Sequence, residues 1–234
     1  MVDPTDLRPT LRHARRAIEL DSTNVVAWHT VAIALADTGN LEAGTEAWRA
    51  CVRRGPSYTQ CLAFLGLAHY WRRQYDSAAA WADSAIAVDP NYVLGRTTAG
   101  SVAIERRDFS RAAAAFDAAR RLSSAVEVVN ALAGSAQVEA RAGRRSEART
   151  ILRRADSLAS AYVPAPLHTA VFLAQAHAAV GEADRALAWL TQYEPGRDLH
   201  FQLHLRCDPP FDPLRGDKRF RSLLVLTPPM ERGC

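Results

Sequence analysis

The stretch 25–92 contains one pattern twice, and this repetition decides the fold. Residues 39–56 read GNLEAGTEAWRACVRRGP, and residues 73–90, which lie 34 positions later, read RQYDSAAAWADSAIAVDP. Trp28 corresponds to Leu62 at the same spacing. A fixed period of this length is typical of one supersecondary unit stacked on copies of itself. The sequence therefore predicts a repeat protein that presents an extended surface.

Each copy divides into two segments whose apolar residues recur with helical periodicity. We expect helices over Val25–Asp37 and Leu41–Arg54 in the first copy, and over Tyr58–Arg72 and Tyr75–Val88 in the second. Gly39 suits the left-handed residue that ends a helix. Glycine and proline are scattered and alanine is abundant, which favours helix over strand. The predicted fold class is all-α, a right-handed α-solenoid built of antiparallel helix pairs.

Beyond residue 92 the helical pairs continue while their spacing lengthens. Ala112 corresponds to Ala148 at 36 residues, and Ala148 corresponds to Ala186 at 38. The extra residues are expected in loops around Ser123–Val126 and Ala159–Pro166, where additional length costs little free energy.

The register divides the chain into three parts. Residues 1–24 match only the second helix of a unit, and the first helix that would cover its apolar face is missing. This indicates either a fragment of a longer protein or an end that self-associates. The predicted parts are a leading half unit over residues 1–24, about five units over residues 25–195 (25–58, 59–92, 93–128, 129–166 and 167–195), and a C-terminal capping segment and tail over residues 196–234.

The second unit carries the pattern of a known family. Small residues let its two helices approach closely, and larger residues fill the gaps between pairs. The pattern comprises Leu62, Leu65, Gly66, His69, Ala78, Ala85 and Pro90. It resembles the tetratricopeptide repeat family. The resemblance implies a superhelix whose concave groove binds a protein or peptide ligand.

The C-terminal run departs from the repeat. Residues 208–220 read DPPFDPLRGDKRF, and a short helix is expected to continue to about Leu224. This run resembles the end of repeat regions in bacterial multidomain signalling proteins, where the repeats follow a serine/threonine kinase, a nucleotide cyclase or a winged-helix regulator. The resemblance implies an interaction region of a signalling or regulatory protein. The alternative is the regulatory C-terminal part of such a larger protein, acting in cis.

Positions of the first helices that do not face the second helices should line the concave surface. Several are large and apolar, which suits an amphipathic helix or an extended peptide, with Tyr70 and Trp71 as anchors. The alternative for each residue is burial between neighbouring helices. The predicted peptide-binding groove comprises His29, Ile33, Gln60, Phe64, Leu67, Tyr70, Trp71, Thr97, Ser101 and Ile104.

Arginine pairs recur near the turn between the two helices of a unit. Stacking would align them as a basic stripe able to meet an acidic partner or a phosphate backbone, but neighbouring acidic residues favour a solvated edge. Nucleic acid is therefore not an expected partner. The pairs are Arg72-Arg73, Arg106-Arg107 and Arg144-Arg145.

One cluster has the spacing of metal ligands. His200, His204 and Cys207 lie four and three residues apart, so a helix would place them on one face, with Asp208 as a fourth zinc ligand. Apolar neighbours such as Leu203 favour a packed helix instead. We expect no metal and no cofactor.

The cysteines lack zinc-finger spacing, which predicts free thiols, a reducing compartment and a cytoplasmic location. Cys51 and Cys61 are expected to pack in the core. No run of about 18 apolar residues occurs, so no membrane association is expected. Motifs of phosphate-binding loops, zinc proteases and nucleophile elbows are missing, which predicts that the chain is not an enzyme.

Overall fold

The computed structural model describes residues 6–122, 124–161, 166–192, 198–224 and 234. Residues 123 and 162–165, where lengthened loops are expected, lie outside this description. The helices are α1 (Arg8–Leu20), α2 (Val25–Asp37), α3 (Leu41–Arg54), α4 (Thr59–Trp71), α5 (Tyr75–Val88), α6 (Val93–Glu105), α7 (Phe109–Leu122), α8 (Ala125–Arg141), α9 (Arg145–Ala159), α10 (Leu167–Val180), α11 (Ala183–Thr191), α12 (Leu199–Cys207), the 3-10 helix η2 (Pro209–Leu214) and α13 (Lys218–Ser222).

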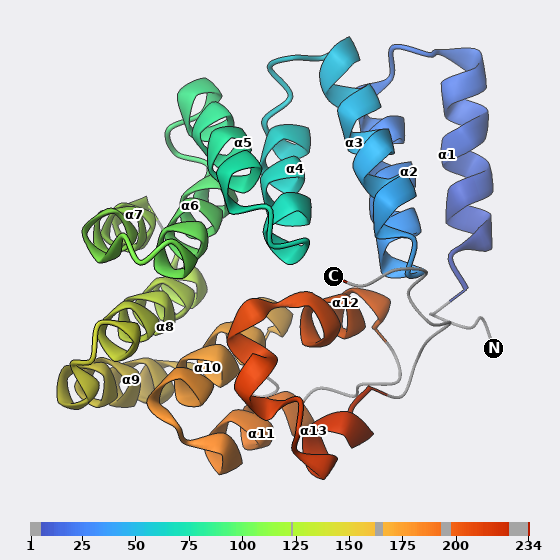
Figure 1. The fold of residues 1–234 in the computed structure, drawn as a ribbon. Coiled ribbons are helices and arrows are strands. Elements are labelled where there is room, and N and C mark those ends of the chain that lie inside the picture. Colours follow the sequence, from blue (N-terminus) through green and yellow to red (C-terminus); the bar gives the residue numbers. More distant parts are fainter. Residues whose placement is uncertain (1–5, 123, 162–165, 193–197, 225–233) are drawn as a thin grey trace.

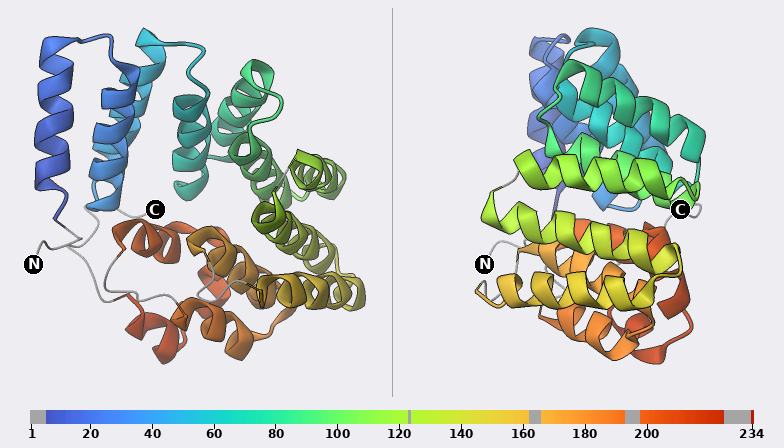
Figure 2. Two further views of the ribbon diagram at one scale, coloured as in Figure 1. Left: turned by 180° about the vertical axis from the view of Figure 1, so that it is seen from behind. Right: turned by 90° about the vertical axis from the view of Figure 1, so that its left-hand side faces the viewer.

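From α2 to α11 the helices pack as consecutive pairs, and each pair packs against the next. The pairs follow an arc, with the first helix of each pair on the inner side (Figures 1 and 2). Helices α2, α3 and α5 begin and end at the expected residues. The described residues contain no strand. The predicted all-α solenoid is confirmed.

Glycine at helix crossings allows the two helices of a pair to approach closely. A Cβ atom on Gly66 would lie 3.2 Å from the backbone nitrogen of Ala82, on the second helix of the same pair. A Cβ atom on Gly100 would lie 2.7 Å from the ring of Phe116, which is fully buried. Larger residues at these positions would force the helices apart.

The turn inside each pair contains a residue with positive φ. These residues are Gly39, Arg73, Arg107, Gly143 and Gly181, with φ of 93°, 58°, 60°, 87° and 86°, so they lie 34, 34, 36 and 38 residues apart. The spacing equals the register read from the sequence. The turns themselves keep one conformation. Between Arg107 and Gly143 the added residues lengthen α8, which has 17 residues against 13 in α6, so the expectation of a longer loop around Ser123–Val126 was wrong. Between Gly143 and Gly181 the longer stretch is the connection between α9 and α10, as expected. The two arginines adopt this left-handed conformation at an energetic cost that glycine avoids.

Helix α1 covers the outer side of α2. Ala14 is buried, and Leu11 and Ile18 pack against the core of the first pairs. The opposite face carries arginine and other polar side chains, as the terminal helices of solenoids do. Most of the apolar face of α1, which we expected to be uncovered, therefore packs against α2. Leu20 at the end of α1 remains 73% exposed.

The C-terminal segment α12–η2 crosses the open side of the arc and contacts the first two pairs (Figure 1). His200 Nδ1 lies 2.9 Å from an Asp37 carboxylate oxygen at the end of α2. Leu203 joins the core cluster that extends from α1 to α6. In η2, Asp212 forms an ion pair of 2.8 Å with Arg73. The segment therefore closes the arc into a ring in addition to covering the last pair.

The cysteines are paired. A disulfide joins Cys51 on α3 to Cys61 on α4, and a second joins Cys207 to Cys234. Cys51 and Cys61 do lie in the core, both at 0% exposure. The expectation of free thiols was wrong, because residues 51 and 61 face each other across the contact between consecutive pairs, an arrangement that sequence spacing does not reveal. Within the described ranges, the helices are all too short or too polar to cross a membrane.

Candidate functional site

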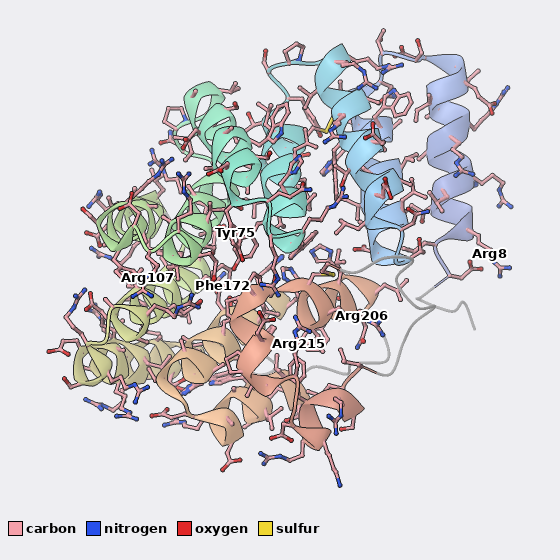
Figure 3. The ribbon with its side chains drawn as sticks, in the orientation of Figure 1. Arg8, Tyr75, Arg107, Phe172, Arg206 and Arg215 are labelled. Carbon is pink, nitrogen blue, oxygen red and sulfur yellow. A yellow bond between two sulfur atoms is a disulfide. The ribbon has the colours of Figure 1, made fainter. Side chains whose placement is uncertain are left out.

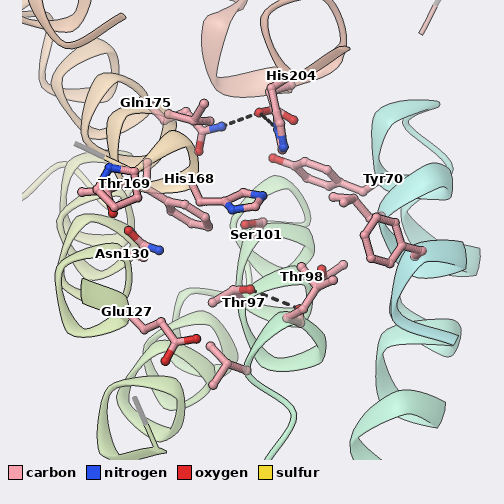
Figure 4. Close-up of a pocket in the computed structure, with 18 of the residues that line it drawn as sticks. Tyr70, Thr97, Thr98, Ser101, Glu127, Asn130, His168, Thr169, Gln175 and His204 are labelled. Carbon is pink, nitrogen blue, oxygen red and sulfur yellow. Dashed lines mark hydrogen bonds and ion pairs between the residues drawn. The ribbon is translucent and has the colours of Figure 1, made fainter. Parts of the chain in front are cut away.

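A cavity of about 580 Å³ lies on the inner side of the ring, and we call it the central cavity. Its wall is formed by the first helices of successive pairs, α4, α6, α8 and α10, together with α12 (Figure 4). The apolar part of the wall includes Phe64, Leu67, Tyr92, Leu94, Val171 and Phe172. An apolar wall with interspersed polar groups is the usual composition of a ligand site.

The polar part of the wall contains buried atoms without partners. Thr98 Oγ1, Asn130 Oδ1, Thr169 Oγ1 and His204 Nε2 have no hydrogen bond within the described part of the chain. All four residues line the central cavity. Buried polar atoms are almost always paired in folded proteins, and an unpaired one costs about 1–3 kcal/mol. Because their side chains line the cavity, small rotations bring these atoms to a ligand that offers hydrogen-bonding groups.

Asp208, at the end of α12, holds three helices together beside the cavity. Its carboxylate accepts hydrogen bonds from Trp71 Nε1 on α4 at 2.7 Å and from Gln175 Nε2 on α10 at 2.6 Å. It lies 2.8 Å from His204 Nδ1. Asp208 is only 2% exposed, and a carboxylate is tolerated at such depth only when donors surround it. These hydrogen bonds therefore fix the position of α12 relative to both walls.

Three histidines meet at the rim of the central cavity. One ring nitrogen from each of His168, His200 and His204 lies within 4.8 Å of the others. Desolvation on the inner side of the closed arc of helices and, less strongly, the two neighbouring histidines lower the pKa of His168 to about 3. Its imidazole is therefore neutral at neutral pH. Burial also opposes protonation of His200, but the hydrogen bond and charge of Asp37 outweigh it and raise the pKa of His200.

No family model matches the sequence, and no curated protein matches it. Solved structures are similar. A tetratricopeptide repeat protein from Parabacteroides merdae is 14% identical, with 93% of this chain and 76% of that chain covered and a TM-score of 0.63. PilW, a widely conserved type IV pilus biogenesis factor, is 18% identical, with 80% of this chain and 84% of that chain covered and a TM-score of 0.61. YrrB, described as a TPR protein with an unusual peptide-binding site, is 14% identical, with 91% of this chain and 98% of that chain covered and a TM-score of 0.53.

The fold is that of tetratricopeptide repeat proteins. At these identities the similarity establishes the fold alone. Helix pairs α2–α3 through α10–α11 are the repeat units, and the central cavity lies on their concave side.

Half of the predicted groove residues line the central cavity. They are Phe64, Leu67, Tyr70, Thr97 and Ser101, from the first helices of the second and third repeats. Their part in binding a peptide remains a prediction.

The other five lie elsewhere. His29 is buried and accepts a hydrogen bond of 3.1 Å from Trp48 Nε1. Ile33 packs against the core of the first repeats, and Ile104 is 2% exposed. Gln60 is exposed and pairs with the hydroxyl of Tyr58. None of these four lines the central cavity among the described residues.

Trp71 is fully buried, so the structure corrects its expected role as an exposed anchor. The cause is the C-terminal segment, which covers the end of α4 and provides Asp208 as a partner for the indole nitrogen. The inner position of the helix is as predicted. Only the long-range contact removes it from the ligand-accessible surface.

Sequence reasoning missed the later repeats of the groove. With the spacing of the turn residues, Leu67 corresponds to Ser101, Gln137 and Gln175, of which all but Gln137 line the central cavity. Extending the groove along this register would have found Gln175. Asn130, which also lines the cavity, corresponds in the same way to Leu94.

The residues with zinc-ligand spacing, for which we expected a packed helix and no metal, come together only in part. His200 and His204 are adjacent, but the sulfur of Cys207 is bonded to Cys234 and lies in the core. Cys207 is therefore excluded as a ligand in this state. His168 on α10 takes its place in the cluster, and no local spacing connects residue 168 with residue 200.

The arginine pairs form a partly neutralised edge. Arg73 pairs with Asp212, Arg106 with Asp76 and Arg144 with Glu139. Arg107, labelled in Figure 3, is exposed to solvent. This distribution agrees with a solvated edge more than with a continuous basic stripe.

Proposed function

We propose that the chain is a protein-interaction scaffold whose central cavity binds a short extended segment of a protein or peptide partner. The observation that carries this proposal is the set of unpaired buried atoms of Thr98, Asn130 and Thr169, beside the apolar wall. An extended peptide offers a backbone donor and acceptor at every residue, and its side chains alternate between two faces. Such a ligand satisfies the polar atoms and covers the apolar wall together.

The ring closure favours an extended segment over a helix. The central cavity, at about 580 Å³, lies within the range of about 300–1,000 Å³ that is typical of sites for small ligands. An α-helix with its side chains is about 10–12 Å wide, and α12 already occupies the concave side where a helix would lie. The proposal includes no catalytic step. The peptide-binding site named for YrrB is consistent with a binding role on this fold.

A display selection tests the proposal. Random peptides are selected on the immobilised chain, and the affinity of enriched peptides is measured by fluorescence anisotropy. Ser101→Trp fills the cavity and should weaken binding at least about tenfold. Ser110→Trp introduces the same side chain on the exposed face of α7, outside the cavity, and should leave affinity unchanged. Equal affinities for the two variants would exclude the central cavity as the site.

The bacterial signalling context is a separate proposal. It is supported by the run 208–220 and by its resemblance to the ends of signalling proteins. Cis regulation of a kinase, cyclase or DNA-binding domain is the alternative within it. An open reading frame that encodes such a domain in frame before residue 1 would favour the alternative.

Location and self-association are also proposals. The spacing of the cysteines predicts a cytoplasmic location. The two disulfides favour an oxidising compartment instead, because disulfides persist mainly there. A thiol count on protein purified under alkylating conditions decides between them. Self-association through α1 rests on the exposed Leu20. If it occurs, Leu20→Glu should reduce the molar mass measured by light scattering.

A further inference from the structure

We propose that His168, His200 and His204 bind a first-row transition-metal cation of the zinc class at the rim of the central cavity. The proposal does not depend on peptide binding. Imidazole nitrogen is a preferred ligand of zinc, and three histidines with one open position form a recurrent zinc coordination set. The three side chains come from α10 and α12, so the fold brings them together.

Carboxylates orient two of the three rings. The Nδ1 atom of His200 lies 2.9 Å from Asp37, and the Nδ1 atom of His204 lies 2.8 Å from Asp208. Each carboxylate therefore occupies one ring nitrogen and leaves Nε2 for a metal. A carboxylate is one of the usual hydrogen-bond partners behind a histidine ligand of a metal.

The Nε2 atom of His204 supplies an independent observation. His204 is 6% exposed, and its Nε2 atom is buried without a hydrogen-bond partner among the described residues. A metal ion would satisfy this atom. The hydrogen bond to Asp208 and the burial of the ring already hold it in the position that a metal ligand requires.

The distances require only a small adjustment. Zinc–nitrogen bonds of about 2.0–2.1 Å in tetrahedral geometry place ligand nitrogens about 3.3 Å apart. The nitrogens here lie within 4.8 Å. His168 is the side chain able to move, since it is exposed and lines the central cavity. Rotation of its side chain closes the set around the ion.

The charge of the surroundings favours a cation. Asp37 and Asp208 have side-chain exposures of only 10% and 2%, and neither pairs with a lysine or arginine side chain in the described ranges. Two carboxylates are therefore buried directly behind the cluster. A divalent cation neutralises them, which offsets the cost of their burial. The central cavity leaves the fourth coordination position accessible to water or to a ligand atom.

Metal titration of the purified chain, stripped with a chelator and dialysed, tests the site. Isothermal titration with Zn²⁺ should give about one ion per chain. Co²⁺ should produce the visible absorption of a tetrahedral nitrogen site. His168→Ala should weaken Zn²⁺ binding by at least about 100-fold, and Asp37→Asn, which changes only the supporting carboxylate, by about 10–100-fold. Circular dichroism should show unchanged helicity for His168→Ala, whose ring is exposed.

Two control variants distinguish these three histidines from the remaining metal-binding side chains of the protein. His13→Ala removes an exposed histidine on α1 and should leave Zn²⁺ affinity unchanged. Cys207→Ala should also leave it unchanged, whereas a site of His200, His204 and Cys207 would lose binding. Wild-type protein that takes up no Zn²⁺, or His168→Ala protein that binds as tightly as wild type, would overturn the proposal.

Discussion

The helix pair α4–α5 and the segment α12–η2 are both well buried, but they depend on different kinds of contact. In α4–α5, small residues such as Gly66 and Ala82 meet within one repeat. In α12–η2, the decisive partners are far apart in the sequence. Asp208 contacts Trp71 across 137 residues, and His200 contacts Asp37 across 163.

The difference shows what a repeat pattern encodes. Periodicity specifies the units and the contacts between neighbours, because each repeat touches mainly the next one. Ring closure depends instead on single polar partners such as Asp208, which has no counterpart at a repeat spacing. Substitutions in each region should therefore differ in size and in what they disrupt.

Trp71→Ala should give the largest effect, because Trp71 belongs to both regions. It removes a fully buried ring and leaves the Asp208 carboxylate without one of its donors. We expect the free energy of unfolding to fall by about 3–5 kcal/mol in urea denaturation followed by circular dichroism. Trp81→Ala on the partly exposed face of α5 is the matched control, with a loss of about half as much. Equal losses would mean that closure adds little stability.

Acid should destabilise the first repeats through His29. Burial lowers the pKa of His29 to about 4 in the folded chain, against about 6.5 when unfolded. The unfolded chain therefore binds a proton between these values and the folded chain does not. The contribution is complete above pH 6.5 and is lost as the pH falls to about 4, by up to about 3 kcal/mol. Urea titrations at several pH values measure it.

His29→Gln serves as the control for this pH effect, since glutamine accepts a hydrogen bond without titrating in this range. The difference between wild type and variant isolates His29 from the carboxylates of the C-terminal segment. If His29→Gln had the same pH dependence of unfolding free energy as wild type, the acid sensitivity would come from the contacts of the C-terminal segment and not from His29.

Gly66→Leu tests the local contact alone. The added side chain would meet the backbone of α5, so overpacking should cost about 1–3 kcal/mol or more. Gly216→Leu is the control in the C-terminal segment, where an added Cβ meets nothing within 4 Å. Thermal melts of the two variants should differ clearly. A melt of Gly66→Leu like that of wild type would refute the close approach of α4 and α5.

Asp212→Asn should give the smallest effect. The ion pair between Asp212 and Arg73 joins the two regions, but both side chains are more than a third exposed, at 48% and 35%. Exposed pairs contribute about 0.2–1 kcal/mol and are screened by salt. Asp83→Asn breaks the comparable pair with Arg111 on the repeat surface and should cost about the same. A much larger loss for Asp212→Asn would make this ion pair a main closing contact.

The sequence predicted the repeats well and the site in part. Apolar periodicity and turn residues such as Gly39 gave the bounds of α2, α3 and α5, because these signals are local. Phe64 and Tyr70 were placed on the inner surface for the same reason. The burial of Trp71 and the approach of His168 to α12 could not be predicted, because both result from the path of a segment without repeat periodicity.

The closed ring also has a kinetic consequence. Contacts within a repeat span short stretches of chain and form fast, whereas contacts across more than a hundred residues form slowly. The repeats should therefore fold before α12 docks, and α12 should be the first element to leave during partial unfolding. Because the indole of Trp71 is covered only while α12 is docked, its fluorescence should report ring opening before helicity falls.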